Sequence, residues 1–281
     1  MDSSNTSQTT SEPSCPASAS LSDEQVSRLA HTPNFAPLTS SGKQICDVKR
    51  LTIRVHDDRT GPVRAFLHVP QDYLREKVER CEKTAAILLS GADGGLVGPS
   101  SMYPSIADKM ASLVRGIPVM RLDYRYPANT NYCVPDVLAA MEYLENKYVI
   151  SRFVLVGWSF GGALVSTVGG SDKRVVGCAM VASQLAETAG IKTMAPRSLL
   201  LMHGTDDRTM RYSCSQELYE DYGEDGEKEL KLFEGDDHVL TEHSTEAEEL
   251  LCDFIMKCAG VDIEFEKPKL MQNDLRDDEE R

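Results

Sequence analysis

The sequence predicts an α/β domain with a mostly parallel central sheet and helices on both faces of that sheet. Two observations lead to this fold class. The middle of the 281-residue chain holds a series of short, continuous apolar runs, which are typical of strands buried on both faces. Longer stretches with helical periodicity separate these runs, and such alternation indicates parallel strands joined by crossover helices.

The domain opens with a predicted hairpin, in which residues 48–57 and 63–70 are the strands around a turn at Thr60-Gly61-Pro62. Five apolar runs predict the buried strands that follow: 84–90, 117–124, 153–157, 175–182 and 198–204. Residues 228–235 are more amphipathic, which favours a strand nearer the sheet edge. The helices are predicted at 103–115, 135–147, 160–169, 213–222 and about 241–259.

Composition divides the chain into one domain and two flanks. Residues 1–42 are rich in Ser, Thr, Pro and Ala and nearly free of large apolar side chains, so we expect this segment to be disordered. Residues 263–281 form an acidic tail, for which we also expect disorder. The domain between them, residues 43–262, is long enough to bury a substantial core.

The charge balance limits the classes of partner. A formal net charge of −14 argues against a nucleic-acid-binding surface and against attachment to anionic lipid, because both need clustered Lys and Arg. No apolar run approaches the roughly 20 residues that cross a bilayer, and the first ten residues lack the pattern of a secretion signal. We therefore expect a soluble cytoplasmic protein without nucleic-acid partners, and a monomer by default.

Metal and nucleotide chemistry are not indicated. The eight cysteines are scattered without a CxxC pair, and the six histidines form no HExxH motif. We expect the cysteines to be buried small hydrophobes or idle surface thiols. The Gly-rich segment 90–95 has neither a Gly-Lys-Ser/Thr ending nor a GxGxxG fingerprint. No metal ion or organic cofactor is therefore expected.

A candidate nucleophile follows the third buried run. The sequence Gly157-Trp158-Ser159-Phe160-Gly161 begins with the last residue of the run FVLVG and leads into a predicted helix. A GxSxG segment at a strand-to-helix junction is a nucleophile elbow, in which a tight turn holds the serine hydroxyl in a strained conformation. The flanking positions must be glycine because any side chain there would collide with the turn. Although GxSxG alone arises by chance, this placement supports Ser159 as a nucleophile.

A serine nucleophile needs a base and an orienting acid, and candidates for both follow Ser159 in the chain. After the run at 198–204 come Thr205, Asp206 and Asp207, and His238 follows the last predicted strand. The carboxyl ends of parallel strands meet at one edge of the sheet, so these side chains can converge on Ser159.

Over residues 45–260 the sequence resembles the α/β-hydrolase superfamily, through GWSFGG, the segment His203-Gly204-Thr205-Asp206-Asp207, and GDDH. The order Ser159, Asp207, His238 is that family's order of nucleophile, acid and base. The resemblance favours Asp207 over Asp206, because the family's acid commonly lies four residues after the histidine, and it leaves His203 a structural role. His243 is the competing base, but we expect it within the last helix and favour His238.

The resemblance also implies an oxyanion hole, which needs two backbone N–H groups. One is the amide of Phe160, directly after the nucleophile, and the other is the amide of Ala92 in the loop after residues 84–90. Many family members begin this loop with His-Gly, whereas this chain has Ser90-Gly91. Because the donors are backbone groups, the departure affects the register of the loop rather than the chemistry.

The segment 183–197, where many members carry a lid, is too short for a large cap domain. The chain is similar to dienelactone-hydrolase-like proteins, although those typically have Cys where this chain has Ser159. Apolar residues beside such an open site are candidates for its lining: Leu96, Met102, Tyr103, Tyr126 and Trp158. For Arg121 and Arg125 we expect surface positions or a salt bridge to Asp123, rather than contact with a substrate carboxylate.

Taken together, the motifs predict a serine hydrolase that cleaves a carboxylic ester or thioester, in a small molecule or an acylated partner, through an acyl-enzyme on Ser159. Two alternatives stay open. A serine peptidase shares the same acyl-transfer residues, and a non-catalytic ligand-binding protein can have the same fold.

Overall fold

The computed structural model describes residues 46–57, 61–71, 73 and 84–265. All of them belong to one of two compact units of the chain, Asn34–Arg281. The expectations for residues 1–42 and for nearly all of 263–281 lie outside the described residues. Within the described part, no helix is both long enough and apolar enough to cross a membrane.

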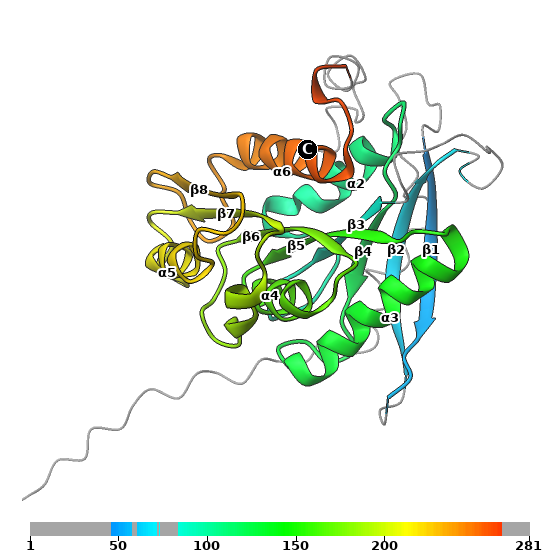
Figure 1. The fold of residues 1–281 in the computed structure, drawn as a ribbon, viewed down its shortest axis with the longest axis horizontal. Coiled ribbons are helices and arrows are strands. Elements are labelled where there is room, and N and C mark those ends of the chain that lie inside the picture. Colours follow the sequence, from blue (N-terminus) through cyan, green and yellow to red (C-terminus); the bar gives the residue numbers. More distant parts are fainter. Residues whose placement is uncertain (1–45, 58–60, 72, 74–83, 266–281) are drawn as a thin grey trace, which may run out of the picture. The chain divides into compact units, whose positions relative to one another are not determined.

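The core of the unit is an eight-stranded sheet with the order β1-β2-β4-β3-β5-β6-β7-β8 (Figure 1). The first two strands form an antiparallel hairpin, and β2 also pairs antiparallel with β4, whereas all other neighbours are parallel. The strands are β1 Cys46–Arg54, β2 Pro62–Pro70, β3 Thr84–Leu89, β4 Val119–Asp123, β5 Arg152–Trp158, β6 Val175–Val181, β7 Ser198–Gly204 and β8 Lys228–Phe233. The predicted fold class is confirmed, and β8 lies at the edge as expected.

Helices cover both faces of the sheet (Figure 1). Two of them, α2 Met102–Ala111 and α6 Ser244–Ala259, pack on one face and share one apolar core with it. The other face carries α3 Thr130–Tyr148, α4 Gly161–Ser171 and α5 Ser213–Asp221, around a second core. Two short 3₁₀ helices complete the described elements: η1 Pro99–Ser101 and η2 Ala189–Thr193.

The inner strands are apolar on both sides because both faces are covered. Every residue of β3 is buried, and six of the seven residues of β7 are buried as well, which is the burial that a parallel sheet between two helical layers requires. The parallel strands β3 to β8 all end at the same edge of the sheet. The loops that follow β3, β5, β7 and β8 are therefore brought together there.

Three helix boundaries differ from the sequence prediction by three or more residues: α2 ends at Ala111 rather than at residue 115, and α3 and α6 begin at other residues than predicted. The prediction begins one helix at Pro135, because proline suits the first turn, but α3 begins at Thr130 and carries Pro135 inside it. Cys133 is fully buried and Val134 packs against the same core, so tertiary packing adds a turn before the proline. The last helix begins at Ser244, which places His243 just before α6 rather than within it.

The cysteines of the described residues are free thiols, as the sequence predicts. Five of these six are buried, and Cys214 is partly exposed. Burial raises the pKa of the fully buried thiols of Cys178 and Cys252 well above the ordinary range. These thiols are therefore small apolar side chains rather than nucleophiles.

Candidate active site

Ser159 lies in the turn between β5 and α4 with a backbone φ of 54°. Its amide donates to the carbonyl of Val181 in the neighbouring strand at 2.8 Å, which holds this left-handed conformation in place. A Cβ atom on Gly157 would lie 2.3 Å from the carbonyl oxygen of Gly161, and a Cβ on Gly161 would lie 2.6 Å from that of Leu89. The turn thus has the close packing that the GxSxG pattern predicts, with both glycines required by sterics.

Asp207 and His238 form a close pair at the ends of β7 and β8. The Nδ1 atom of His238 lies 2.6 Å from Oδ2 of Asp207, and the carboxylate is fully buried while the imidazole keeps some exposure. The other carboxylate oxygen accepts hydrogen bonds from the amides of Thr209, at 2.7 Å, and Met210, at 2.8 Å. Because Nδ1 donates to a carboxylate, the neutral imidazole has an unprotonated Nε2 that can act as a base.

Trp158 connects His238 to the turn that holds Ser159. Its indole Nε1 donates to the backbone carbonyl of His238 at 3.0 Å, and the two rings lie 5.5 Å apart between centroids. Trp158 directly precedes Ser159, so the loop after β8 is fixed beside the nucleophile turn. The structure thus gathers Ser159, Asp207 and His238 at one edge of the sheet.

The competing residues have other roles. Asp206 is exposed, and its amide donates to the carbonyl of Asp236. The imidazole of His243 pairs with the buried carboxylate of Asp236, with Nδ1 3.0 Å from Oδ2, and the His243 amide donates to the same oxygen. His243 is therefore held away from Asp207 by its own acid, although it does not lie within the helix as expected.

The loop after β3 lies against the nucleophile turn. A Cβ on Gly91 would lie 3.3 Å from the Trp158 ring and 3.6 Å from Cβ of Ser159. Among the described residues, the backbone hydrogen bonds of loops and turns use neither the Ala92 nor the Phe160 amide, so the assignment of these amides to an oxyanion hole stays a prediction. The loop is anchored by Tyr124, whose hydroxyl donates to the Ser90 carbonyl at 2.8 Å.

The expected apolar lining is only partly correct. Met102 and Tyr103 are buried in the core between α2 and the sheet, and the Tyr103 hydroxyl donates to the Leu89 carbonyl. These two residues are packing residues, because their helix turns them inward. Leu96 and Trp158 stay partly exposed and Tyr126 is exposed, so these three remain candidates for substrate contact.

The two arginines near β4 are structural, but with partners other than Asp123. Arg125 is buried and pairs with Asp57 and Asp136, at closest distances of 2.6 and 2.5 Å. Arg121 is buried too and donates to the Leu96 carbonyl at 3.0 Å. Their partners come from distant parts of the chain, which sequence spacing does not reveal.

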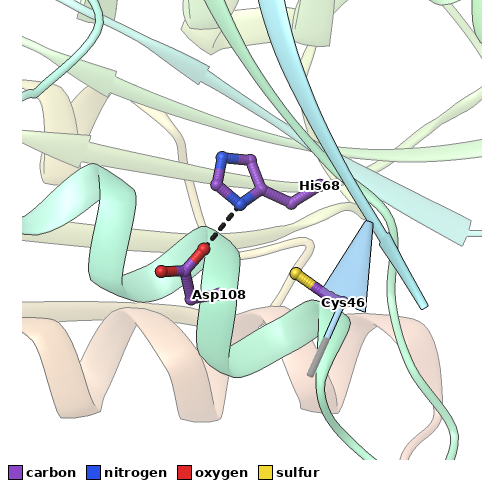
Figure 2. Close-up of side chains that lie close together, drawn as sticks. All are labelled: Cys46, His68 and Asp108. Carbon is purple, nitrogen blue, oxygen red and sulfur yellow. Dashed lines mark ion pairs between the residues drawn. The ribbon is translucent and has the colours of Figure 1, made fainter. Parts of the chain in front are cut away.

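Within the described part of the chain, one group of side chains brings together atoms of the types that bind metals: Cys46, His68 and Asp108, all buried, with those atoms within 4.8 Å of one another. In Figure 2 the Asp108 carboxylate and the Cys46 sulfur lie on the same side of the His68 ring, and Nδ1 is 2.6 Å from Oδ1 of Asp108. On the other side of the ring, Nε of Arg121 donates to Nε2 of His68 at 3.1 Å.

This second contact argues against a metal centre. An arginine Nε always carries a hydrogen, so Nε2 of His68 is the acceptor and the proton of the neutral ring lies on Nδ1. A metal would need the Nδ1 lone pair instead. These residues therefore fit a buried polar cluster and do not fit a metal site.

His68 gives the fold a specific pH dependence. Burial lowers the pKa of His68 below its ordinary value, so below about pH 6.5 the unfolded chain binds a proton that the folded chain does not. The free energy of unfolding is therefore not reduced by His68 above that pH, and it falls as the pH decreases below it. We expect His68→Gln to reduce the loss of unfolding free energy between pH 7.5 and 5.5 by about 1 kcal/mol.

Thermal and urea unfolding at the two pH values measure this difference. His56→Gln is the matched control, because His56 is exposed and its replacement is expected to leave the pH dependence as in the native chain. Equal losses in all three proteins would show that His68 is protonated equally in the folded and unfolded states.

The family comparison agrees with the fold and the motifs. The sequence matches the family described as alpha/beta hydrolase fold over residues 87–278. Among curated protein sequences, none matches this chain.

Solved structures of esterases and of a dienelactone hydrolase have the same fold. Est1E from Butyrivibrio proteoclasticus is 14% identical with a TM-score of 0.58, over 75% of this chain and 99% of its own. The Pyrococcus furiosus esterase Pf2001 is 14% identical with a TM-score of 0.61, and the match covers 75% of this chain and 93% of the esterase chain. The dienelactone hydrolase from Anabaena variabilis is 12% identical with a TM-score of 0.59, and the match covers 75% of this chain and 98% of the dienelactone hydrolase chain.

At these identities the solved structures establish the fold alone. The family match is independent of them and spans most of the chain, including the nucleophile turn and the loops that carry Asp207 and His238. The protein belongs to the α/β-hydrolase fold family.

Proposed function

We propose that the chain is a serine hydrolase that cleaves a carboxylic ester or thioester through an acyl-enzyme on Ser159. The observation that carries the proposal is the Asp207–His238 pair, 2.6 Å apart, beside a serine held at positive φ in a glycine-flanked turn. Ser159, Asp207 and His238 are of the residue types that acyl transfer requires. The loops that carry them follow strands that end at one edge of the sheet, as acyl transfer also requires.

In the first half of the reaction, Nε2 of His238 takes the proton from the Ser159 hydroxyl as its oxygen attacks the carbonyl carbon. The Asp207 carboxylate stabilises the imidazolium that forms and keeps Nδ1 as the donor. The amides of Ala92 and Phe160 stabilise the negative charge on the carbonyl oxygen. The tetrahedral intermediate then collapses, the leaving alcohol or thiol accepts the proton from His238, and the acyl group stays on Ser159.

In the second half, a water molecule gives a proton to Nε2 of His238 and attacks the acyl-enzyme. The carboxylic acid leaves, and the proton returns to Ser159. These steps need no group beyond those of the chain and water.

The loops around the site favour accessible acyl groups. The segment between β6 and β7 contains only the short helix η2, so no helical lid covers the site from this connection. Trp158, which directly precedes Ser159, offers partly exposed aromatic surface there, and Tyr126 is exposed in the loop after β4. We infer short acyl esters, or acyl groups displayed on a larger molecule, as substrates. The esterases and the dienelactone hydrolase of the same fold support the ester class.

A matched substrate panel tests the reaction class. One short acyl group is offered as a p-nitrophenyl ester, a thioester and a p-nitroanilide, and kcat/KM is measured for each. We expect turnover of the ester and the thioester and little of the anilide. Preferential cleavage of the anilide would indicate a peptidase, and absence of turnover by folded protein would favour a ligand-binding role.

A further inference from the structure

A second histidine lies behind the acid. His203 ends β7 with a fully buried side chain. Its Nε2 lies 3.1 Å from Oδ2 of Asp207 and 3.1 Å from the carbonyl oxygen of Met210. Its Nδ1 lies 2.7 Å from the hydroxyl of Ser215, which is also buried, on α5. Both ring nitrogens of His203 therefore have defined partners.

These partners determine where the proton lies. Nε2 faces two oxygens that can only accept, so it carries the hydrogen and donates to them. Nδ1 then has a free lone pair and accepts a hydrogen bond from the Ser215 hydroxyl. Burial lowers the pKa of His203, although the Met210 carbonyl and the Asp207 charge oppose the shift. The ring is therefore neutral, in the Nε2–H form, when His238 works as a base.

As a result, Oδ2 of Asp207 is shared by two imidazoles. His203 donates to it from β7 and His238 donates to it from the loop after β8, while Oδ1 accepts the amides of Thr209 and Met210. Four donors fix the orientation of this carboxylate. The hydrogen bond from His203 also draws negative charge away from the oxygen that His238 uses, which weakens its hold on a protonated His238.

We propose that His203 is a positioning residue, held in its Nε2–H form by Ser215, that orients Asp207 and makes His238 easier to deprotonate. The proposal rests on the proposed function for its catalytic meaning, but its structural content is independent of turnover. It implies that the hydrogen-bonded series Ser215–His203–Asp207–His238 acts as one unit.

Two further ionisable features belong to the elements that carry this hydrogen-bonded series. One is Cys214 of α5. Burial raises the pKa of its thiol, and the charges of Glu217 and Asp207 add to the rise, so the thiol stays neutral. The other is the ionic pair of Asp236 with His243, in the loop between β8 and α6. The change in His238 titration is thus assigned by comparing variants of His203 and Ser215 with a variant of His243.

The first experiment needs no activity. Imidazole ¹⁵N NMR of the full chain between pH 8 and 5 reports the tautomer of His203 and the titration midpoint of His238. We expect His203 to stay in its Nε2–H form over most of this range. His203→Leu is expected to move the His238 midpoint upward by roughly half a pH unit or more, because Asp207 then holds the proton more tightly.

Conservative variants separate this role from packing. His203→Gln can still donate an N–H to Asp207, so its His238 midpoint is expected near that of the native chain. Ser215→Ala removes the hydroxyl that selects the tautomer, which is expected to give a smaller upward shift, whereas Ser215→Thr keeps the native value. If His203→Leu does not fold, Ser215→Ala alone tests whether the His238 midpoint moves. His243→Gln is the control, with no shift expected.

The pH profile of kcat/KM on the preferred ester then links the shift to the reaction. We expect the acidic limb to move with the NMR midpoint in each variant, since His238 must be neutral to act. An unmoved His238 midpoint in folded His203→Leu or Ser215→Ala protein would overturn the proposal. Absence of turnover in the native chain would instead count against the proposed function, while the NMR result still decides the role of His203.

Discussion

Ser159→Ala is expected to lower kcat/KM on the preferred ester by about 10⁴-fold or more. The reason is that an acyl-enzyme cannot form without the hydroxyl, and the oxyanion amides alone give only residual catalysis. The fold is expected to stay intact, because the amide of residue 159 keeps its bond to the Val181 carbonyl. Initial rates and thermal unfolding of purified native and variant protein measure both effects.

Ser171→Ala is the matched control for this prediction. Ser171 lies at the exposed end of α4 and its hydroxyl donates to the Thr167 carbonyl, so its loss is expected to leave the rate unchanged. A folded Ser159→Ala protein that hydrolyses the ester at the native rate would show that another group is the nucleophile.

Asp207→Asn is expected to cause a loss of similar size, about 10⁴-fold in kcat. In the native chain Oδ2 accepts the proton-bearing Nδ1 of His238 at 2.6 Å. An asparagine NH₂ group at this point favours the opposite tautomer, with the proton on Nε2, where it blocks attack by Ser159. Rates of ester hydrolysis at pH 8, with circular dichroism to confirm folding, measure the effect.

Asp206→Asn distinguishes the role of Asp207 from that of the neighbouring carboxylate. Asp206 is exposed and precedes Asp207 directly, so its replacement is expected to change the rate by less than about twofold, as for a surface substitution. Comparable losses in both variants would mean that the loop, rather than one carboxylate, supports the base.

Local patterns were sufficient to predict the strands and the loops that carry the candidate site. Each inner strand is a continuous apolar run. Gly157 is dictated by contacts with Gly161 and Val165, a few residues along the chain, whereas the contact that dictates Gly161 comes from Leu89 in β3. Asp207 and His238 follow strands that end at one edge, so chain order alone predicts that they converge. The spacing from His203 to Asp207 was read from the family resemblance.

Interactions between distant residues were not predictable in this way. The Asp236 carboxylate accepts hydrogen bonds from the amides of Glu242 and His243, so α6 begins only after these residues. The helical periodicity of the sequence does not indicate these hydrogen bonds. The partners of Arg125 lie 68 and 11 residues away. The contact between Ser215 and His203 depends on how α5 packs against β7, so the sequence carried no signal for it.

Labelling with a fluorophosphonate probe tests the central claim most directly, because the probe reacts with a serine only when a base and an oxyanion hole activate it. Native protein, Ser159→Ala and His238→Ala are treated in parallel, and the labelled peptide is mapped by mass spectrometry. We expect one label on Ser159 in the native chain and none in either variant. Folded native protein that stays unlabelled, or a label on another residue, would contradict the assignment of Ser159, Asp207 and His238 as a catalytic triad.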